Sequence, residues 1–285
     1  MKTFETGDGV AIAYEEAGNR GDGAPLVLLH GWTGFAADFG DHPEALARGR
    51  RVLVPDLRGH GASARFRTEA DVTFAALVED LVSFLSGVAR VPVHLLGHSM
   101  GGMIALRAAL DPRVELASLI LMDTTAAPLE GIDLASAALG GRIAREQGMA
   151  TLARRLRELE SGSQDRAPAA RAHERAWGER YWAWRAARIE AMDPLAYEAF
   201  VRAMAEQEGV VGRLGEIRVP TLVMVGSQDR GFLQPSAVMA RDIPDARLAL
   251  IVGAAHQPQF EAPARWREVL QEHLDRVEAL GAAAR

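Results

Sequence analysis

The segment Gly-His-Ser-Met-Gly-Gly, residues 97–102, surrounds one serine with glycines at a change of pattern along the chain. It follows the apolar run Val91–Leu96 and precedes the Ala- and Leu-rich stretch Met103–Leu110. Glycine is common in ordinary tight turns between a strand and a helix. It is also required where a sharp strand-to-helix bend leaves no room for neighbouring side chains. The segment therefore predicts either a plain turn or a strained bend that holds Ser99 at the end of a strand.

Apolar runs and helix-like stretches alternate along much of the chain. The runs predicted to be strands are Val10–Glu15, Leu26–His30, Val52–Pro55, Val93–Leu96, Leu119–Met122, Thr221–Val225 and Leu248–Val252. The stretches predicted to be helices are Ala36–Arg48, Phe74–Val88, Met100–Leu110, Pro235–Arg241 and Pro263–Ala279. This alternation is typical of an α/β fold with a mostly parallel sheet covered on both faces. Because no helix separates the first two strands, we expect an antiparallel edge.

The alternation stops between residues 126 and 219, where no convincing strand appears. The stretch is rich in Ala, Arg, Glu and Leu, and it predicts a helical insertion between two consecutive strands. Within Arg171–Arg188, the aromatic residues Trp177, Tyr181 and Trp184 recur on one helix face. They are predicted either to form the core of the insertion or to bind substrate. We expect a core domain of residues 1–125 and 220–285 with a helical cap of residues 126–219.

Composition excludes several kinds of chemistry and partner. The chain of 285 residues contains no cysteine, which excludes disulfides, a thiolate nucleophile and zinc–thiolate clusters. Lys2 is its only lysine, which excludes a P-loop and argues against a lysine nucleophile. The eight histidines form no metal-binding motif, so neither a metal nor a cofactor is expected.

The charge and the hydropathy pattern bear on partners and location. The net charge is −6 and the pI about 5.8, which gives no basic surface for nucleic acid. The first ten residues contain no apolar core of a signal peptide, and no apolar run is long enough to span a membrane. We expect a cytoplasmic protein that acts on a small molecule, with no membrane partner. The sequence does not determine the oligomeric state.

The surroundings of Ser99 predict a nucleophile. Residues 97–101 fit G-x-S-x-G, and the end of a parallel strand is where ligands gather. A serine hydroxyl also needs a base and an orienting acid. His256 lies after the last predicted strand, and Asp229 lies after the strand Thr221–Val225. A serine held on a sharp bend between a strand and a helix is called a nucleophile elbow. The order Ser, Asp, His along the chain is the one expected when such an elbow carries a catalytic triad.

Asp123 is an alternative acid, because it also ends a strand. Asp229 is favoured because a single strand–helix–strand unit brings it and His256 to the same edge of the sheet. Asp123 is followed by two threonines and is better suited to cap the turn into the insertion.

Acyl transfer also needs two N–H donors for the developing oxyanion. The N–H of Met100 follows the nucleophile directly, and the N–H of Trp32 lies in the segment HGWTG after a predicted strand. We predict that these two amides form the oxyanion hole.

The segments LVLLHGW, VPDLRGHGAS, LLGHSMGG and GAAHQPQFEAP, taken in this order, resemble the α/β-hydrolase superfamily. The resemblance covers about two thirds of the chain. It implies an α/β-hydrolase fold in which Asp56, Arg58 and His60 are structural and His98 packs beside or orients its neighbours. The insertion matches the cap of that family only in its position and helical character.

The residue at the elbow narrows the chemistry that this resemblance implies. Haloalkane dehalogenases and epoxide hydrolases carry aspartate there, whereas this chain has Ser99. Superfamily members with serine include carboxylesterases, lactonases, thioesterases, aminopeptidases and C–C bond hydrolases. We predict an esterase or lactonase acting on a small, mainly apolar substrate. The alternatives are a C–C bond hydrolase of diketone ring-fission products and a member that binds a small molecule without hydrolysing it.

Overall fold

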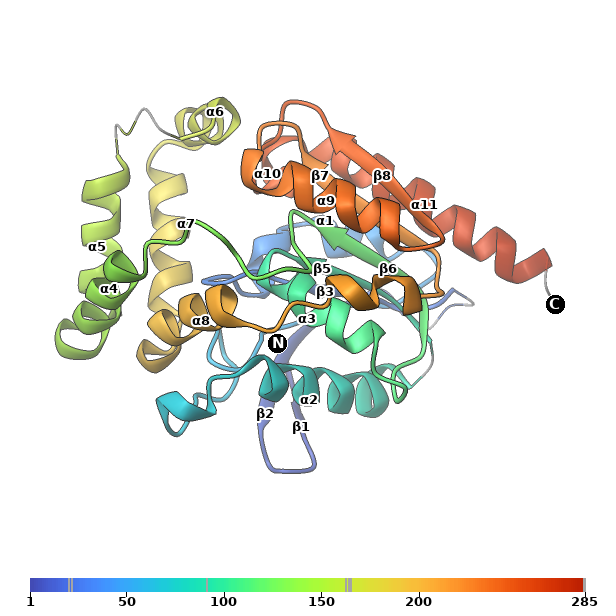
Figure 1. Cartoon of the computed structure of the whole chain (residues 1–285), viewed down its shortest axis with the longest axis horizontal. Coiled ribbons are helices and arrows are strands. Elements are labelled where there is room, and N and C mark those ends of the chain that lie inside the picture. Colours follow the sequence, from blue (N-terminus) through green and yellow to red (C-terminus); the bar gives the residue numbers. More distant parts are fainter. Residues whose placement is uncertain (20, 22, 91, 162, 164–165, 284–285) are drawn as a thin grey trace.

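The computed structural model describes residues 1–283 apart from residues 20, 22, 91, 162 and 164–165. Eight strands form one sheet with the order β1-β2-β4-β3-β5-β6-β7-β8 (Figure 1). Their bounds are Lys2–Glu5, Ala11–Ala17, Leu26–Leu29, Val52–Pro55, Val93–His98, Leu116–Met122, Thr221–Gly226 and Ala246–Ile251 for β1 to β8. The pairs β1–β2 and β2–β4 are antiparallel and the other pairs are parallel. The predicted fold class and the antiparallel edge are therefore confirmed.

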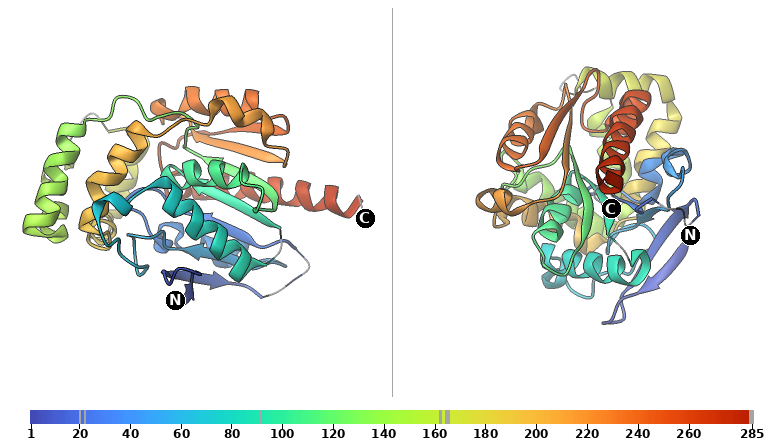
Figure 2. Two further views of the ribbon diagram at one scale, coloured as in Figure 1. Left: turned by 60° about the horizontal axis from the view of Figure 1, so that its bottom comes forward. Right: turned by 90° about the vertical axis from the view of Figure 1, so that its right-hand side faces the viewer.

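Helices cover both faces of the sheet (Figure 2). One face packs against α2 (Phe74–Phe84), α3 (Met100–Ala109) and α9 (Arg230–Asp242). The other packs against α1 (His42–Leu46) and α11 (Pro263–Ala283), whose Trp266 is fully buried. None of the helices in the described residues is long and apolar enough to cross a membrane.

The predicted helix Ala36–Arg48 is interrupted. A 3-10 turn at Ala36–Phe39 ends at Gly40, whose φ of 51° is in the left-handed region, and α1 begins two residues later. Gly40 adopts this conformation without a steric penalty, and Pro43 favours a new helix start. The prediction of one continuous helix was therefore wrong.

The insertion between β6 and β7 contains α4 (Leu134–Gln147), α5 (Met149–Glu160), α6 (Pro168–Trp177), α7 (Glu179–Glu190) and α8 (Pro194–Glu206). A 3-10 turn at Val211–Glu216 follows them. Helices α4, α5, α7 and α8 gather at one end of the sheet (Figures 1 and 2). No strand occurs between residues 126 and 219 in the part of the chain that is described.

The helix predicted over Arg171–Arg188 is also interrupted. Gly178 has a φ of 55° and separates α6 from α7. Trp177 therefore ends one helix, whereas Tyr181 and Trp184 belong to the next. The three aromatic residues do not share the face of a single helix.

The loop after β4 is held by Asp56, whose carboxylate accepts hydrogen bonds from the N–H groups of Ala36 at 2.7 Å and Ala62 at 2.8 Å. Arg58 forms an ion pair with Asp80, and the buried His60 ring stacks on Phe200. These contacts link the loop to the 3-10 turn, to α2 and to α8.

Candidate active site

Ser99 lies between β5 and α3 with a φ of 53°, a strained value for a residue with a side chain. A Cβ on Gly97 would lie 2.4 Å from the carbonyl oxygen of Gly101. A Cβ on Gly101 would lie 2.5 Å from the carbonyl oxygen of His30 in the neighbouring loop. Because neither position has room for a side chain, the segment is a strained bend rather than a plain turn.

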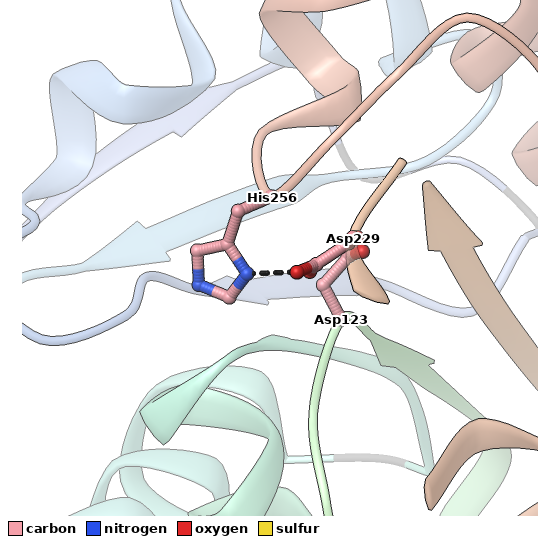
Figure 3. Close-up of side chains that lie close together, drawn as sticks. All are labelled: Asp123, Asp229 and His256. Carbon is pink, nitrogen blue, oxygen red and sulfur yellow. Dashed lines mark hydrogen bonds and ion pairs between the residues drawn. The ribbon is translucent and has the colours of Figure 1, made fainter. Parts of the chain in front are cut away.

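The hydroxyl of Ser99 begins a chain of hydrogen bonds. Its Oγ lies 3.1 Å from Nε2 of His256. Nδ1 of the same imidazole lies 2.7 Å from Oδ2 of Asp229, the contact drawn as a dashed line in Figure 3. Asp229 follows β7 and His256 follows β8, so two adjacent parallel strands deliver these side chains to the same edge. The structure brings together the serine, histidine and aspartate that the sequence pattern predicts.

Neighbouring groups fix the His256 loop. The ring of Phe232 stacks on the His256 imidazole with centroids 5.0 Å apart. Burial lowers the pKa of His98 well below its ordinary value. The neutral His98 has Nε2 2.7 Å from the His256 carbonyl oxygen, an arrangement in which Nε2–H donates.

Glu261, in the short helix α10 (Pro258–Glu261), holds the same loop from the other side. Its Oε2 accepts hydrogen bonds from the N–H groups of Ala255 at 2.6 Å and Gln257 at 3.3 Å. These residues flank His256 on both sides. Sequence reasoning missed Glu261 and Phe232, although Glu261 follows the predicted base closely enough to be a candidate.

The residues predicted to form the oxyanion hole, Met100 and Trp32, lie close to Ser99 along the chain or in space. Met100 is the first residue of α3, so its N–H has no acceptor within the helix. Trp32 lies in the loop after β3 and lines the same cavity as Ser99. Within that loop, Gly31 favours the close approach, because a Cβ there would make a tight contact of 3.0 Å with the Cβ of Ser99.

His30 orders the loop that carries Trp32. Its Nε2 accepts a hydrogen bond from the N–H of Leu57 at 3.0 Å, which leaves Nδ1–H to donate to the carbonyl oxygen of Gly31 at 2.8 Å. Burial lowers the pKa of His30 well below its ordinary value, so this tautomer is neutral.

A cavity of about 390 Å³ opens beside Ser99 and His256, under side chains of α5, α7 and α8. A larger apolar cavity of about 810 Å³ lies between α4, α5 and α8. The residues that line both cavities are Trp32, Leu129, Leu156, Tyr197 and Met204. Because they share these walls, the two cavities are separated by no more than one layer of side chains.

The predicted substrate-binding residues Trp177, Tyr181 and Trp184 lie elsewhere. They form an aromatic cluster with Phe260 of α10 and His173 of α6, with ring centroids 4.4–6.4 Å apart. None of the three lines either cavity. They attach α6 and α7 to the core instead, and Tyr197 and Leu156 occupy the cavity wall.

A buried ion pair joins the insertion to the core near the Trp32 loop. Nη2 of Arg188, on α7, lies 3.0 Å from Oδ2 of Asp38 in the 3-10 turn after that loop. Burial raises the pKa of Asp38 to about 6, against the opposing effect of the Arg188 charge. Arg188 also lines the smaller cavity, so this ion pair lies close to the space beside Ser99.

Asp123, the alternative acid, lies in the same cluster. One ligand atom from each of Asp123, Asp229 and His256 lies within 4.8 Å of the others, the one such grouping of three among the described residues (Figure 3). The distance of 2.7 Å between Nδ1 of His256 and Oδ2 of Asp229 is that of a hydrogen bond.

Comparison with known proteins gives a family and several relatives. Residues 24–263 match the family model described as alpha/beta hydrolase fold. Several curated relatives are matched over 104–123 residues, and the chain spans only 30–40% of their length. One is the dihydrolipoyllysine-residue acetyltransferase component of an acetoin cleaving system from Pseudomonas putida, 38% identical over 40% of this chain and 30% of that protein.

Other relatives align over nearly their whole length, and two of them are esterases. A pimeloyl-[acyl-carrier protein] methyl ester esterase from Nitrosospira multiformis is 26% identical over 85% of this chain and 91% of its own. The structure of a thermophilic esterase from Thermogutta terrifontis superposes with a TM-score of 0.80 at 26% identity, covering 97% of this chain and 99% of that one.

Proposed function

Because the chain belongs to the alpha/beta hydrolase fold family, we propose that it is a serine hydrolase that cleaves a carboxylic ester or lactone. The observation that carries the proposal is the hydrogen-bonded chain from Ser99 through His256 to Asp229. The esterases among its relatives support the same class of reaction.

In the proposed mechanism Ser99 Oγ attacks the carbonyl carbon of the ester while Nε2 of His256 accepts the hydroxyl proton. Asp229 holds the imidazole tautomer and stabilises the imidazolium that forms. The N–H groups of Trp32 and Met100 bind the oxyanion. The C–O bond breaks as His256 returns the proton to the leaving alkoxide oxygen, which leaves an acyl group on Ser99. Water activated by His256 then releases the acid and restores the serine.

The proposed substrate is small and mainly apolar. A cavity of about 390 Å³ beside Ser99 is of the size that small-molecule sites occupy. Ile189, Tyr197 and Met204 contribute apolar surface to its wall. In this proposal the insertion of residues 126–219 is a cap that sets substrate choice, because α5, α7 and α8 supply that wall.

Substitution at the shared wall of the two cavities is expected to change the preference for acyl length. Leu156→Trp should lower kcat/KM for p-nitrophenyl hexanoate relative to the acetate ester by at least about tenfold, since a lost apolar subsite has that order of effect. The control is Trp177→Phe, which alters a side chain that lines neither cavity. Equal acyl-length profiles in the two variants would contradict the proposed role of this wall.

The reaction class is tested with a panel of chromogenic esters, lactones and ring-fission diketones, each assayed with the native protein and with Ser99→Ala. We expect turnover of esters or lactones by the native protein only. Cleavage of diketones alone would favour C–C bond hydrolysis. Saturable binding of the panel without turnover would favour a binding protein.

A further inference from the structure

The position of Asp123 does not fit the turn-capping role predicted for it. Asp123 follows β6, the strand beside β7 that delivers Asp229, and its own φ is 47°. Its N–H donates to the carbonyl oxygen of Met224 at 3.0 Å, and its Oδ1 accepts from the N–H of Gly226 at 2.9 Å. Both partners belong to β7 rather than to the start of the insertion, so the carboxyl group is directed at the Asp229 turn.

The other oxygen of Asp123 lies among negative groups. Asp123 is fully buried, and no N–H group donates to its Oδ2. The titratable groups around it are Asp229 of the β7–α9 turn, Glu261 of α10 and His256 of the β8–α10 loop. Asp123, Asp229 and His256 each place one carboxylate oxygen or ring nitrogen within 4.8 Å of the others, and Figure 3 shows the three side chains together.

Two carboxylates with oxygens within 4.8 Å of each other, one of them fully buried, cannot both remain ionised at low cost. Burial, followed by the charge of Asp229, raises the pKa of Asp123 well above its ordinary value. Asp229 is the group that accepts from His256, so it is the member of the pair that needs its charge. The proton therefore belongs on Asp123.

We propose that Asp123 is a protonated carboxylic acid whose O–H donates a hydrogen bond to Asp229 and holds that carboxylate against Nδ1 of His256. Oδ1 of Asp123 meanwhile remains an acceptor for the Gly226 N–H. Asp123 is a positioning residue in this arrangement, because it touches the acid and not the substrate. This role rests on the proposed hydrolase function, but the protonation state does not.

The hydrogen-bonding pattern of a neutral carboxylic acid is also that of an amide. In Asp123→Asn the amide oxygen can accept from Gly226 and the NH₂ group can donate to Asp229. In Asp123→Leu a side chain of similar size does neither. Comparing the two variants therefore distinguishes the effect of losing the hydrogen bonds from the effects of losing a charge or of changing the side-chain volume.

The test compares kcat, KM and the pH dependence of kcat/KM for p-nitrophenyl acetate in the native protein and both variants. Asp123→Asn should keep kcat within about threefold and leave the acid limb of the profile in place, since no charge is removed. Asp123→Leu should lower kcat by about 10- to 100-fold with little change in KM, the effect of losing a hydrogen bond to a charged group. A downward shift of the acid limb by about one pH unit in Asp123→Asn would show that Asp123 is ionised and would overturn the proposal.

A second measurement does not depend on activity or on the folding of the leucine variant. The infrared spectrum at pH 7 should contain the carbonyl band of a protonated carboxylic acid in the native protein, and Asp123→Asn should lack it. If the native protein lacks this band, the protonation is disproved. If the band is present but no ester is hydrolysed, the proposed function fails while the protonated Asp123 stands.

Discussion

Ser99→Ala is expected to lower kcat for ester hydrolysis by roughly 10⁶-fold, the loss seen when a triad nucleophile is removed. The hydroxyl is the group that lies 3.1 Å from Nε2 of His256, and alanine leaves the imidazole without a proton to accept there. The backbone strain at φ 53° is the same for serine and alanine, so the fold should be retained.

The measurement is kcat on p-nitrophenyl acetate together with thermal unfolding followed by circular dichroism. Ser86→Ala serves as the matched control, because that serine is exposed and hydrogen-bonds only within its own helical turn. If a folded Ser99→Ala protein retained more than about one hundredth of native activity, Ser99 would not be the nucleophile, since removing a triad nucleophile lowers kcat far more than about 100-fold.

Asp229→Asn is expected to lower kcat by roughly 10³- to 10⁴-fold. Nδ1 of His256 lies 2.7 Å from the carboxylate oxygen. An amide NH₂ group in that place would favour the imidazole tautomer with its proton on Nε2, which cannot accept the proton of Ser99. The loss should appear in kcat more than in KM, because Asp229 does not line the cavity beside Ser99.

Asp123→Asn provides the comparison for that prediction, because the two aspartates occupy the ends of adjacent strands. Its activity should remain close to that of the native protein. If both variants are folded and the ranking is reversed, the triad acid is Asp123 and not Asp229.

The sheet and the serine elbow could be predicted because their causes are local. The strand Val52–Pro55 coincides with an apolar run of the sequence. The serine elbow is marked by glycines at residues 97 and 101, where the structure has no room for a side chain. The strand Lys2–Glu5 was missed, since it is an exposed edge of four residues without an apolar run. The break at Gly178 was missed because a single glycine does not by itself end a helical pattern.

The surroundings of the candidate site depend on contacts between distant segments. Asp123 and Asp229 are separated by the whole insertion, and their carboxyl groups meet because β6 and β7 are neighbours and Asp123 has a positive φ. The cavity wall likewise combines Trp32 of the core with Leu156 and Tyr197 of the insertion. A hydrophobic pattern predicts that such residues are buried but not which of them face the same space.

Covalent labelling tests the acyl-enzyme mechanism most directly. The protein is treated with a p-nitrophenyl alkylphosphonate, digested and mapped by mass spectrometry, with Ser99→Ala treated in parallel. We expect one phosphonyl group on the peptide containing Ser99, loss of esterase activity in proportion to labelling, and no adduct in the variant. An adduct on another residue, or an active esterase that remains unlabelled at Ser99, would contradict the assignment of the nucleophile.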